Sequence, residues 1–221
     1  KAAVQLHHAH SGSAVVLDVA TGEVLAMVNQ PSYNPNNREG MRGDLLRNRA
    51  ITDLFEPGST VKPFTVAAAL ETGKYRPGTY IDTAPGYYKI GRHLVRDASN
   101  YGLLADYRGW KEIERASLSF GYGLSVTPLQ LCLAYTVLGD EGRLKPVSFV
   151  PVEGSVGGRE IMSGRTATEI IRMMETVVSE QGTANLAKVA GYRVAGKTGT
   201  VQKLGADGYS DQHYVSVFAG L

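Results

Sequence analysis

The chain has 221 residues, 43% of them hydrophobic, which is enough to fold around a core rather than remain disordered. Its net charge of +2 at pH 7, without a dense run of Lys and Arg, gives no reason to expect nucleic acid as a partner. No apolar run approaches the roughly 20 residues of a membrane helix, and no signal peptide is present. Because the chain starts at Lys1 without a methionine, we expect a processed or partial chain.

Two strands are the first predicted elements. Val and Leu are frequent in residues 14–19 and again in 24–28, and Gly22 in the turn between them can adopt a positive φ. This pattern predicts an antiparallel hairpin, followed by a Pro- and Asn-rich loop over residues 30–37. A short helix is expected over residues 44–53.

Two longer helices are predicted in the middle of the chain. The first follows the Pro57-Gly58 turn and ends at Gly73. The second begins at Pro128, with Thr127 as its N-cap. The apolar face of the first helix is expected to comprise Val61, Phe64, Ala68 and Leu70.

The last third of the chain is predicted to hold one amphipathic helix, over residues 163–182, and three strands. The strands are expected over residues 146–154, 191–200 and 214–221, and a Gly/Asp-rich loop joins the last two. A hairpin, then mainly helices, then strands is an order typical of an α+β fold, in which helices flank an antiparallel sheet. The apolar side of the amphipathic helix is expected to comprise Ile170, Ile171, Met174, Val177 and Val178.

Two features that could suggest chemistry favour a simpler interpretation. Cys132, the only cysteine, lies in an apolar run and is expected to be a buried free thiol. His7, His8 and His10 form a short His-rich stretch, but no Cys or carboxylate cluster accompanies them. We therefore expect neither a metal nor a cofactor.

The stretch "GYRVAGKTGT", residues 191–200, matches two motifs at once. Its first part fits the phosphate-binding pattern G-x-x-x-x-G-K-[ST], and its end fits the K-T-G motif of penicillin-recognising serine enzymes. A phosphate-binding loop must be followed by a helix, but the residues after Thr200 include two glycines and show no helical period. The sequence therefore favours a strand that carries K-T-G.

The K-T-G motif requires an S-x-x-K motif at the start of a helix, and Ser59-Thr60-Val61-Lys62 provides it. No other serine in the chain has a lysine three residues later. Ser59 and Lys62 would lie on one helix face. The positive end of the helix and the nearby Lys197 would both disfavour a charged Lys62. A neutral amine could take the proton of the Ser59 hydroxyl, and free backbone N–H groups could stabilise an oxyanion.

The strand that carries K-T-G suggests a substrate site. Thr198 and Thr200 share one face, where two hydroxyls could hold a carboxylate. Gly199 would allow another backbone to approach, and a peptide could add to the strand by main-chain hydrogen bonds. Strict alternation places Lys197 on the other face, so its side chain would have to curl around the strand edge to reach the serine.

Four segments together resemble the transpeptidase domain of class B penicillin-binding proteins: "FEPGSTVKPF", "NQPSYNPN", "FGYGLSVTPLQL" and "AGKTGT". The resemblance covers nearly the whole chain and is closest to the division-specific penicillin-binding protein 3 type of Gram-negative bacteria. It implies a serine β-lactamase/D,D-transpeptidase-like fold, cross-linking of septal peptidoglycan stem peptides, acylation by β-lactams, and a metal-free site. It also implies a periplasmic domain of an inner-membrane-anchored protein, with the anchor absent here, that works with division-machinery proteins.

The resemblance assigns roles to individual residues. Ser59 would be the nucleophile and Lys62 the base, and the backbone N–H groups of Ser59 and Thr200 would form the oxyanion hole. Lys197, Thr198, Gly199 and Thr200 would form the third motif, with Lys197 catalytic and the other three binding substrate. Tyr122 would line the cleft, although a buried aromatic in a glycine turn is an equally good interpretation.

One family motif is missing. No S-x-N lies between Lys62 and Lys197: Ser99-Asn100 has the wrong spacing, and Ser32-Tyr33-Asn34 precedes the nucleophile. The stretch "YGLLADYRGW" is also too short for the family's helical subdomain. We therefore expect residues 1–221 to be an incomplete transpeptidase domain. A segment would be missing near residues 100–110, together with the family's last strand and C-terminal helix.

Three other functions remain open. A β-lactamase or carboxypeptidase would use the same nucleophile, but no glutamate stands in a recognisable context for deacylation. A non-catalytic penicillin-binding sensor would be consistent with the missing S-x-N. A phosphate-binding-loop nucleotidase would require ATP binding.

Overall fold

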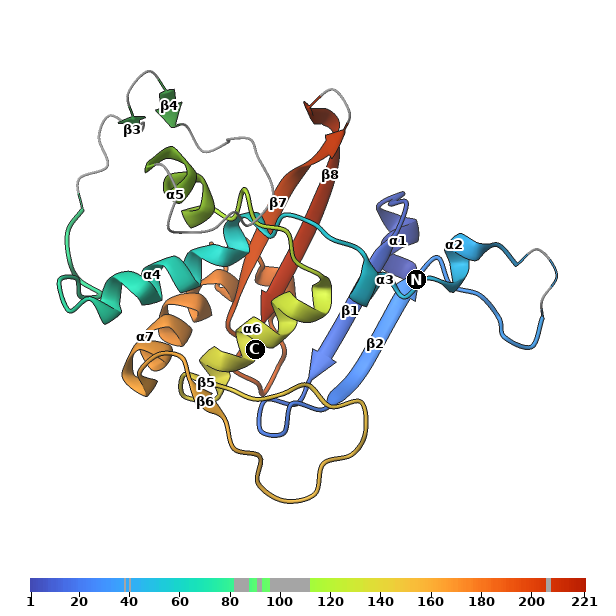
Figure 1. The fold of residues 1–221 in the computed structure, drawn as a ribbon, viewed down its shortest axis with the longest axis horizontal. Helices are drawn as coiled ribbons and strands as arrows, with labels where there is room; N and C mark the ends of the chain where they lie inside the picture. Colours follow the sequence, from blue (N-terminus) through green and yellow to red (C-terminus); the bar gives the residue numbers. More distant parts are fainter. Residues whose placement is uncertain (38, 40, 82–87, 91–92, 96–111, 206–207) are drawn as a thin grey trace.

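The computed structural model describes residues 1–37, 39, 41–81, 88–90, 93–95, 112–205 and 208–221 (Figure 1). The helices are α1 (Ala2–Leu6), α2 (Gly43–Leu46), α3 (Arg49–Thr52), α4 (Lys62–Glu71), α5 (Glu112–Ser119), α6 (Pro128–Gly139) and α7 (Gly164–Glu175), with 3-10 helices η1 (Gly58–Val61), η3 (Thr176–Val178) and η4 (Asn185–Ala187). The strands are β1 (Gly12–Leu17), β2 (Val24–Gln30), β3 (Tyr88–Ile90), β4 (His93–Val95), β5 (Arg143–Leu144), β6 (Arg159–Glu160), β7 (Gly196–Gly205) and β8 (Gly208–Gly220).

The strands pair as antiparallel hairpins, as the α+β prediction requires. β1 pairs with β2 and β7 with β8, and the two short pairs β3–β4 and β5–β6 are also antiparallel. The predicted first hairpin is confirmed, with Gly22 in its turn at φ +78°. A side chain at Gly22 would also collide with the carbonyl oxygen of Pro146, so this turn requires glycine for two reasons.

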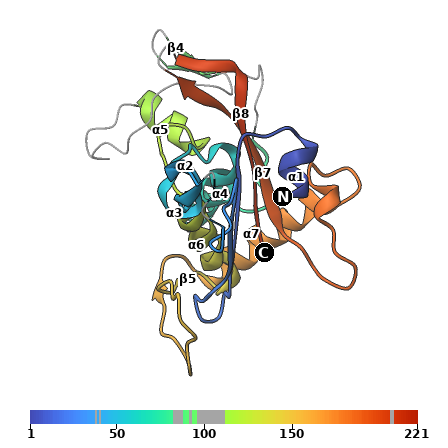
Figure 2. The same cartoon turned by 90° about the vertical axis from the view of Figure 1, so that its right-hand side faces the viewer.

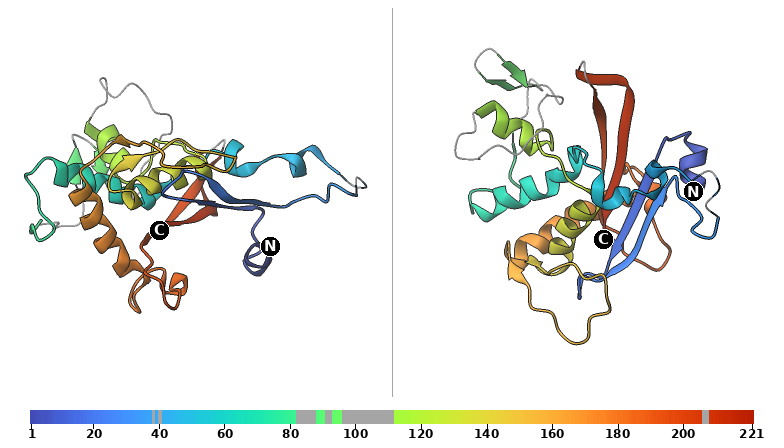
Figure 3. Two further views of the ribbon diagram at one scale, coloured as in Figure 1. Left: turned by 90° about the horizontal axis from the view of Figure 1, so that it is seen from below. Right: turned by 45° about the vertical axis from the view of Figure 1, so that its right-hand side comes forward.

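The helices lie mainly on one side of the two long hairpins. Figure 3 shows α4 and α6 on that side and α1 on the other, and Figure 2 shows the same division from a second direction. Helix α6 contacts both β1 and β8, so it joins the two hairpins to one core. In Figure 1, β8 lies between β7 and the β1–β2 hairpin.

Helix α6 forms the centre of the core. Thr127 caps it as predicted, in a capping box in which its hydroxyl accepts from the Gln130 N–H and its own N–H donates to the Gln130 side chain. Tyr135, in the middle of the helix, is 1% exposed, and its ring packs edge-to-face against Phe64 of α4. The buried hydrophobic cluster comprises Ala67, Leu131, Tyr135, Val137, Leu138, Met162, Ala167, Ile170, Met174, Ala195 and Ala219.

The predicted apolar face of α4 is partly wrong. Ala67 is 2% exposed and belongs to the core, whereas the predicted Ala68 is exposed. Phe64 and Leu70 do pack against the core. Within α4 the core-facing residues Phe64, Ala67 and Leu70 follow each other at intervals of three, so the error is confined to the choice of Ala68 over its neighbour Ala67.

Three other predicted elements are wrong: one strand starts later than expected, one strand does not form, and one helix is divided in two. Strand β7 begins at Gly196 rather than at Gly191, because Gly191 is in a turn at φ +82° and Ala195 is the first residue whose backbone pairs with the end of the chain, at Leu221. Residues 146–154 form no strand: two prolines there lack the N–H that a ladder needs, and Ser148 alone bridges to Glu23. The helix expected over residues 44–53 is two short helices, α2 and α3.

Helix α7 is shorter and strand β8 is longer than predicted. The helix expected over residues 163–182 ends at Glu175 and continues as the 3-10 helix η3. Strand β8 begins at Gly208 rather than at Tyr214. The expected discontinuity near residues 100–110 lies outside the described residues.

Candidate active site

The S-x-x-K motif lies where a tight turn enters α4. Gly58 has φ +52°, and the next residues form η1, which runs directly into α4 at Lys62. Thr60 between them is fully buried; its hydroxyl donates to the Pro57 carbonyl at 2.6 Å, and its own carbonyl accepts from Tyr135 Oη at 2.8 Å. These bonds fix the backbone on the far side of the turn, and Ser59 and Lys62 are left half-buried.

Strand β7 packs directly on this turn. A side chain at Gly199 would come within 3.1 Å of the Pro57 carbonyl oxygen and 3.2 Å of Thr60 Cγ2, and a side chain at Gly58 would collide with Val201. The backbone of K-T-G therefore approaches the backbone of the S-x-x-K turn as closely as glycine permits. The structure thus brings together two motifs that are more than half the chain apart.

The hydrogen-bond pattern of β7 shows where its backbone groups point. Ala195 and Leu221 exchange both backbone bonds, at 2.9 and 2.7 Å. Because such pairs alternate along an antiparallel ladder, the pairs Thr198–Phe218 and Thr200–Ser216 are of the type whose backbone groups point away from the partner strand. The N–H of Thr200 and the C=O of Thr198 therefore lie at the edge of β7 opposite β8.

Lys197 lies on the face of β7 that meets the Pro57–Val61 turn, called the nucleophile turn because it carries the expected nucleophile Ser59. It shares that face with Gly199 and Val201, the two residues packed on the turn. The predicted alternation is confirmed, since Thr198 and Thr200 lie on the opposite face from Lys197. The expectation that the Lys197 face points away from the serine is wrong, because that face packs on the turn. The ammonium of Lys197 does curl to the edge of β7 opposite β8, where it donates to the Thr198 carbonyl at 2.8 Å.

A third segment, residues 119–126, completes the site. Phe55 and Val126 exchange two backbone bonds, at 3.0 and 2.9 Å, and Gly58 N–H donates to the Gly121 carbonyl at 3.1 Å. Within this segment the ring of Phe120 lies 5.2 Å from Lys62 Nζ, a cation–π distance. Tyr122, the predicted cleft residue, is half-buried in this segment.

Three residues of this region were not anticipated from the sequence. Glu56 accepts from the Gly123 N–H at 3.0 Å, and the hydroxyl of Thr183 lies 2.8 Å from that of Thr198. Burial raises the pKa of Tyr135, whose hydroxyl holds the turn. Of these three, only Tyr135 could have been identified from the sequence, because a tyrosine at a core position of an apolar helix needs a hydrogen-bond partner for its hydroxyl.

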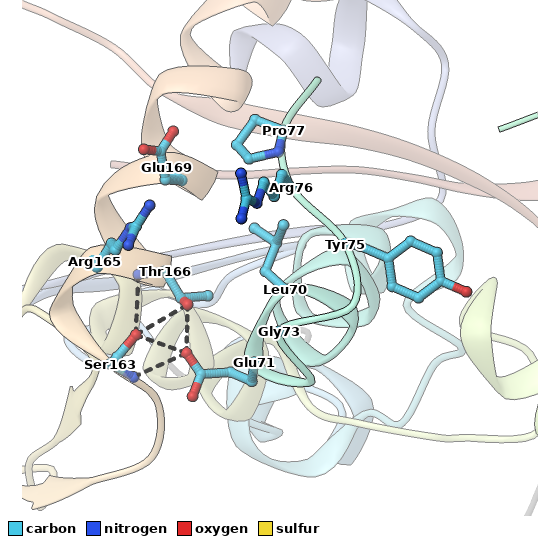
Figure 4. Close-up of a pocket in the computed structure, with 10 residues that line it drawn as sticks. All are labelled: Leu70, Glu71, Gly73, Tyr75, Arg76, Pro77, Ser163, Arg165, Thr166 and Glu169. Atoms are coloured by element: carbon cyan, nitrogen blue, oxygen red, sulfur yellow. Dashed lines mark hydrogen bonds between the residues drawn. The ribbon is translucent and has the colours of Figure 1, made fainter. Parts of the chain in front are cut away.

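A separate hollow of about 490 Å³ lies between the end of α4 and the start of α7, away from Ser59 (Figure 4). At its base the Glu71 carboxylate accepts from the N–H of Ser163 at 3.3 Å, from the Ser163 hydroxyl at 2.7 Å and from the Thr166 hydroxyl. The carboxylate thus joins the two helices at the N-terminus of α7, where a negative charge is favoured.

The Glu71 contacts predict acid-sensitive stability. The hydrogen bonds from Thr166 and Ser163 lower the pKa of Glu71 below its ordinary value of 4.5. A carboxyl with a lowered folded-state pKa contributes its full stability above the unfolded value and loses it as the pH falls through the folded value. We expect Glu71→Gln to reduce the free energy of unfolding at neutral pH and to flatten its decline below pH 4.5. Urea unfolding across that range measures both; equal pH slopes for the two proteins would contradict the prediction.

The single cysteine and the short His-rich stretch, the other residues considered in the sequence, are not assigned to a catalytic or metal site. Cys132 is half-buried rather than fully buried, and burial raises the pKa of its thiol. Within the described residues, His7, His8 and His10 belong to no group of three or more side chains that could hold a metal. None of the helices in this part of the chain is long and apolar enough to cross a membrane.

Comparisons with known proteins bear on the whole chain. The sequence model of the penicillin binding protein transpeptidase domain matches residues 12–110 and 96–221. The peptidoglycan D,D-transpeptidase FtsI of Escherichia coli K12 is 38% identical over 270 residues, which is 99% of this chain and 46% of the relative. The probable peptidoglycan D,D-transpeptidase PenA of Neisseria flavescens is 36% identical, with 99% of this chain and 67% of the relative covered.

A solved structure matches as well. The transpeptidase domain of penicillin-binding protein 3 from Burkholderia pseudomallei superposes with a TM-score of 0.85 and is 34% identical, and the match covers 99% of this chain and 78% of that one. The two share a fold of helices and antiparallel sheet. The chain spans about half the length of the Escherichia coli relative, and the match there extends over more residues than the 221 of this chain.

Proposed function

We propose, from the premise that the chain belongs to the penicillin-binding protein transpeptidase domain family, that it is a serine acyl-transferase which cross-links peptidoglycan stem peptides. The relatives named D,D-transpeptidase support the reaction class, and the division-specific names FtsI and penicillin-binding protein 3 support a role at the septum. One observation carries the proposal at the level of the site: the close packing of Gly199 on the Pro57–Thr60 turn. It places K-T-G beside the S-x-x-K serine, which neither motif alone requires.

The proposed chemistry starts at Ser59. Its oxygen attacks the carbonyl carbon before the terminal D-Ala of a stem peptide, and its proton passes to the Lys62 amine. The tetrahedral oxyanion is stabilised by the N–H groups of Ser59 and Thr200, the bond to D-Ala breaks, and the departing amine takes the proton held by Lys62. The amino group of a second stem peptide then attacks the acyl-enzyme and releases Ser59 with its proton restored.

The edge of β7 opposite β8, to which no other strand of the described residues pairs, is the proposed docking position for the peptide. Outward-pointing backbone groups at Thr198 and Thr200 can pair with an extended chain as a further strand does. Lys197 Nζ reaches the same edge, where a cation would attract a terminal carboxylate. We propose that the Thr198 and Thr200 hydroxyls assist this recognition and that Tyr122 lines the cleft.

We also propose that the chain lacks an internal segment of its family's domain. Its support is threefold: the absence of S-x-N between Lys62 and Lys197, the match of the family in two pieces, and a match to the Escherichia coli relative over more residues than the chain has. The peptidoglycan substrate in the relatives' names supports a periplasmic site of action. Anchoring in the inner membrane and contacts with division proteins belong to the same proposal.

The intact mass of the chain after incubation with benzylpenicillin tests the function. We expect one added antibiotic, located by peptide mapping on Ser59, because a β-lactam ring opens on the serine without losing an atom. A single burst with nitrocefin would accompany it. Continuous nitrocefin turnover without a trapped adduct would indicate a β-lactamase instead, and the absence of any adduct would contradict the proposal.

A further inference from the structure

The nucleophile turn and the segment 119–126 are held together mainly by backbone contacts. Phe55 pairs with Val126, and Gly58 N–H donates to the Gly121 carbonyl. Gly121 has φ +82°, and a side chain there would collide with Gly58. The two segments therefore run against each other with no side chain between them at this point, immediately before Ser59.

Glu56 adds a side-chain contact in the middle of this backbone pairing. Its Oε1 accepts from the Gly123 N–H at 3.0 Å, across 67 residues of sequence. The carboxylate stands between the Phe55–Val126 pair and the Gly58–Gly121 bond, and it is half-buried. A hydrogen bond from a backbone N–H to a charged acceptor is stronger than one to a neutral acceptor, so this contact restrains the backbone at Gly123, which has φ +78°.

The restrained segment reaches the reacting groups on two sides. The Gly121 carbonyl holds the Gly58 N–H, directly before Ser59. Phe120 places its ring 5.2 Å from Lys62 Nζ, and Tyr122 follows the same backbone. Movement at Gly123 would therefore reach both the nucleophile and the expected base.

We propose that Glu56 is a positioning residue for acylation: its carboxylate fixes residues 120–123 and thereby aligns Ser59 and Lys62. The inference rests on the proposed function and adds to it a residue outside the S-x-x-K and K-T-G motifs. Glu56 touches the backbone of the segment, so it acts through the position of other groups and takes no proton in the reaction.

Alanine and glutamine variants of Glu56 test the proposal. An error of about 1 Å in the position of reacting groups can cost about 10²-fold in rate, so we expect Glu56→Ala to lower the limiting acylation rate with a fluorescent penicillin about tenfold or more. Apparent binding of the penicillin should change less. Glu56→Gln should recover most of the rate, because its amide oxygen can still accept from the Gly123 N–H.

Glu71→Ala is the matched control. This variant also removes a carboxylate that accepts a backbone N–H and joins distant segments, but far from Ser59. It should lower stability and leave the acylation rate of the folded protein unchanged. Hydrogen exchange over residues 119–126 should rise in Glu56→Ala and not in Glu71→Ala, and this readout needs no substrate.

The outcomes separate the inference from the function. If the parent chain is acylated and Glu56→Ala reacts at the parental rate, the positioning role is wrong. An equal loss of acylation rate in Glu56→Gln and Glu56→Ala would also overturn it, because the side-chain oxygen that accepts from the Gly123 N–H would then have no role in the rate. If the parent chain is not acylated at all, the proposed function fails first and the inference falls with it.

Discussion

Replacing Lys62 with alanine is expected to lower the rate of acylation of Ser59 by β-lactams by about 10²-fold or more, the usual contribution of a positioned general base. Lys62 begins α4 directly after η1, so it and Ser59 lie within one turn of the same helical segment. No other group is expected to take the serine proton at the start of the reaction. Stopped-flow measurement of adduct formation with nitrocefin gives the rate.

The control for this prediction is Lys74→Ala. Lys74 follows the end of α4 and is exposed, so its removal takes away one positive charge without touching the nucleophile turn. We expect Ser59 of the Lys74→Ala variant to be acylated at the parental rate. Loss of rate in both variants would point to the overall charge, and an unchanged rate in Lys62→Ala would mean that another group takes the proton.

Gly121→Ala is expected to damage stability and chemistry together. Its new methyl group would overlap the Gly58 backbone, where no flexible side chain can move aside, and φ +82° strains any residue other than glycine. Overpacking and backbone strain each cost about 1 to 3 kcal/mol, so we expect the free energy of unfolding to fall by about 3 kcal/mol. Displacement of Gly58 would also shift Ser59, and the acylation rate of the molecules that fold should fall about 10²-fold.

Gly73→Ala separates strain from collision. Gly73 also has a positive φ, +70°, but an added side chain would meet nothing within 4 Å. The free energy of unfolding of this variant should fall by about 1 kcal/mol because of backbone conformation alone, and Ser59 should be acylated at the parental rate. Urea unfolding and nitrocefin kinetics on both variants make the comparison. If the two variants lost similar amounts of unfolding free energy and acylation rate, the contact between Gly121 and Gly58 would not be the cause of the effect in Gly121→Ala.

Local signals in the sequence were sufficient for much of the fold. The Thr127 cap, the Gly22 turn and the pairing of the last two strands all depend on residues close together in the chain. Errors occurred where distant contacts decide. Residues 191–195 have strand-like composition, but of these Ala195 alone pairs, with Leu221. In α4 the core includes Ala67 rather than its neighbour Ala68, which depends on where α7 packs against that helix.

The sequence by itself determined which residues could carry the chemistry. Ser59 with Lys62 at helical spacing and K-T-G in a stretch without a helix signal follow from local pattern, because spacing along one element fixes which side chains share a face. The tertiary structure decided how these motifs meet. Lys197, not Thr198, shares the face turned to the nucleophile, and Glu56 reaches Gly123 across the chain. Neither could be predicted from spacing, since both depend on which face of one element packs against another distant in sequence.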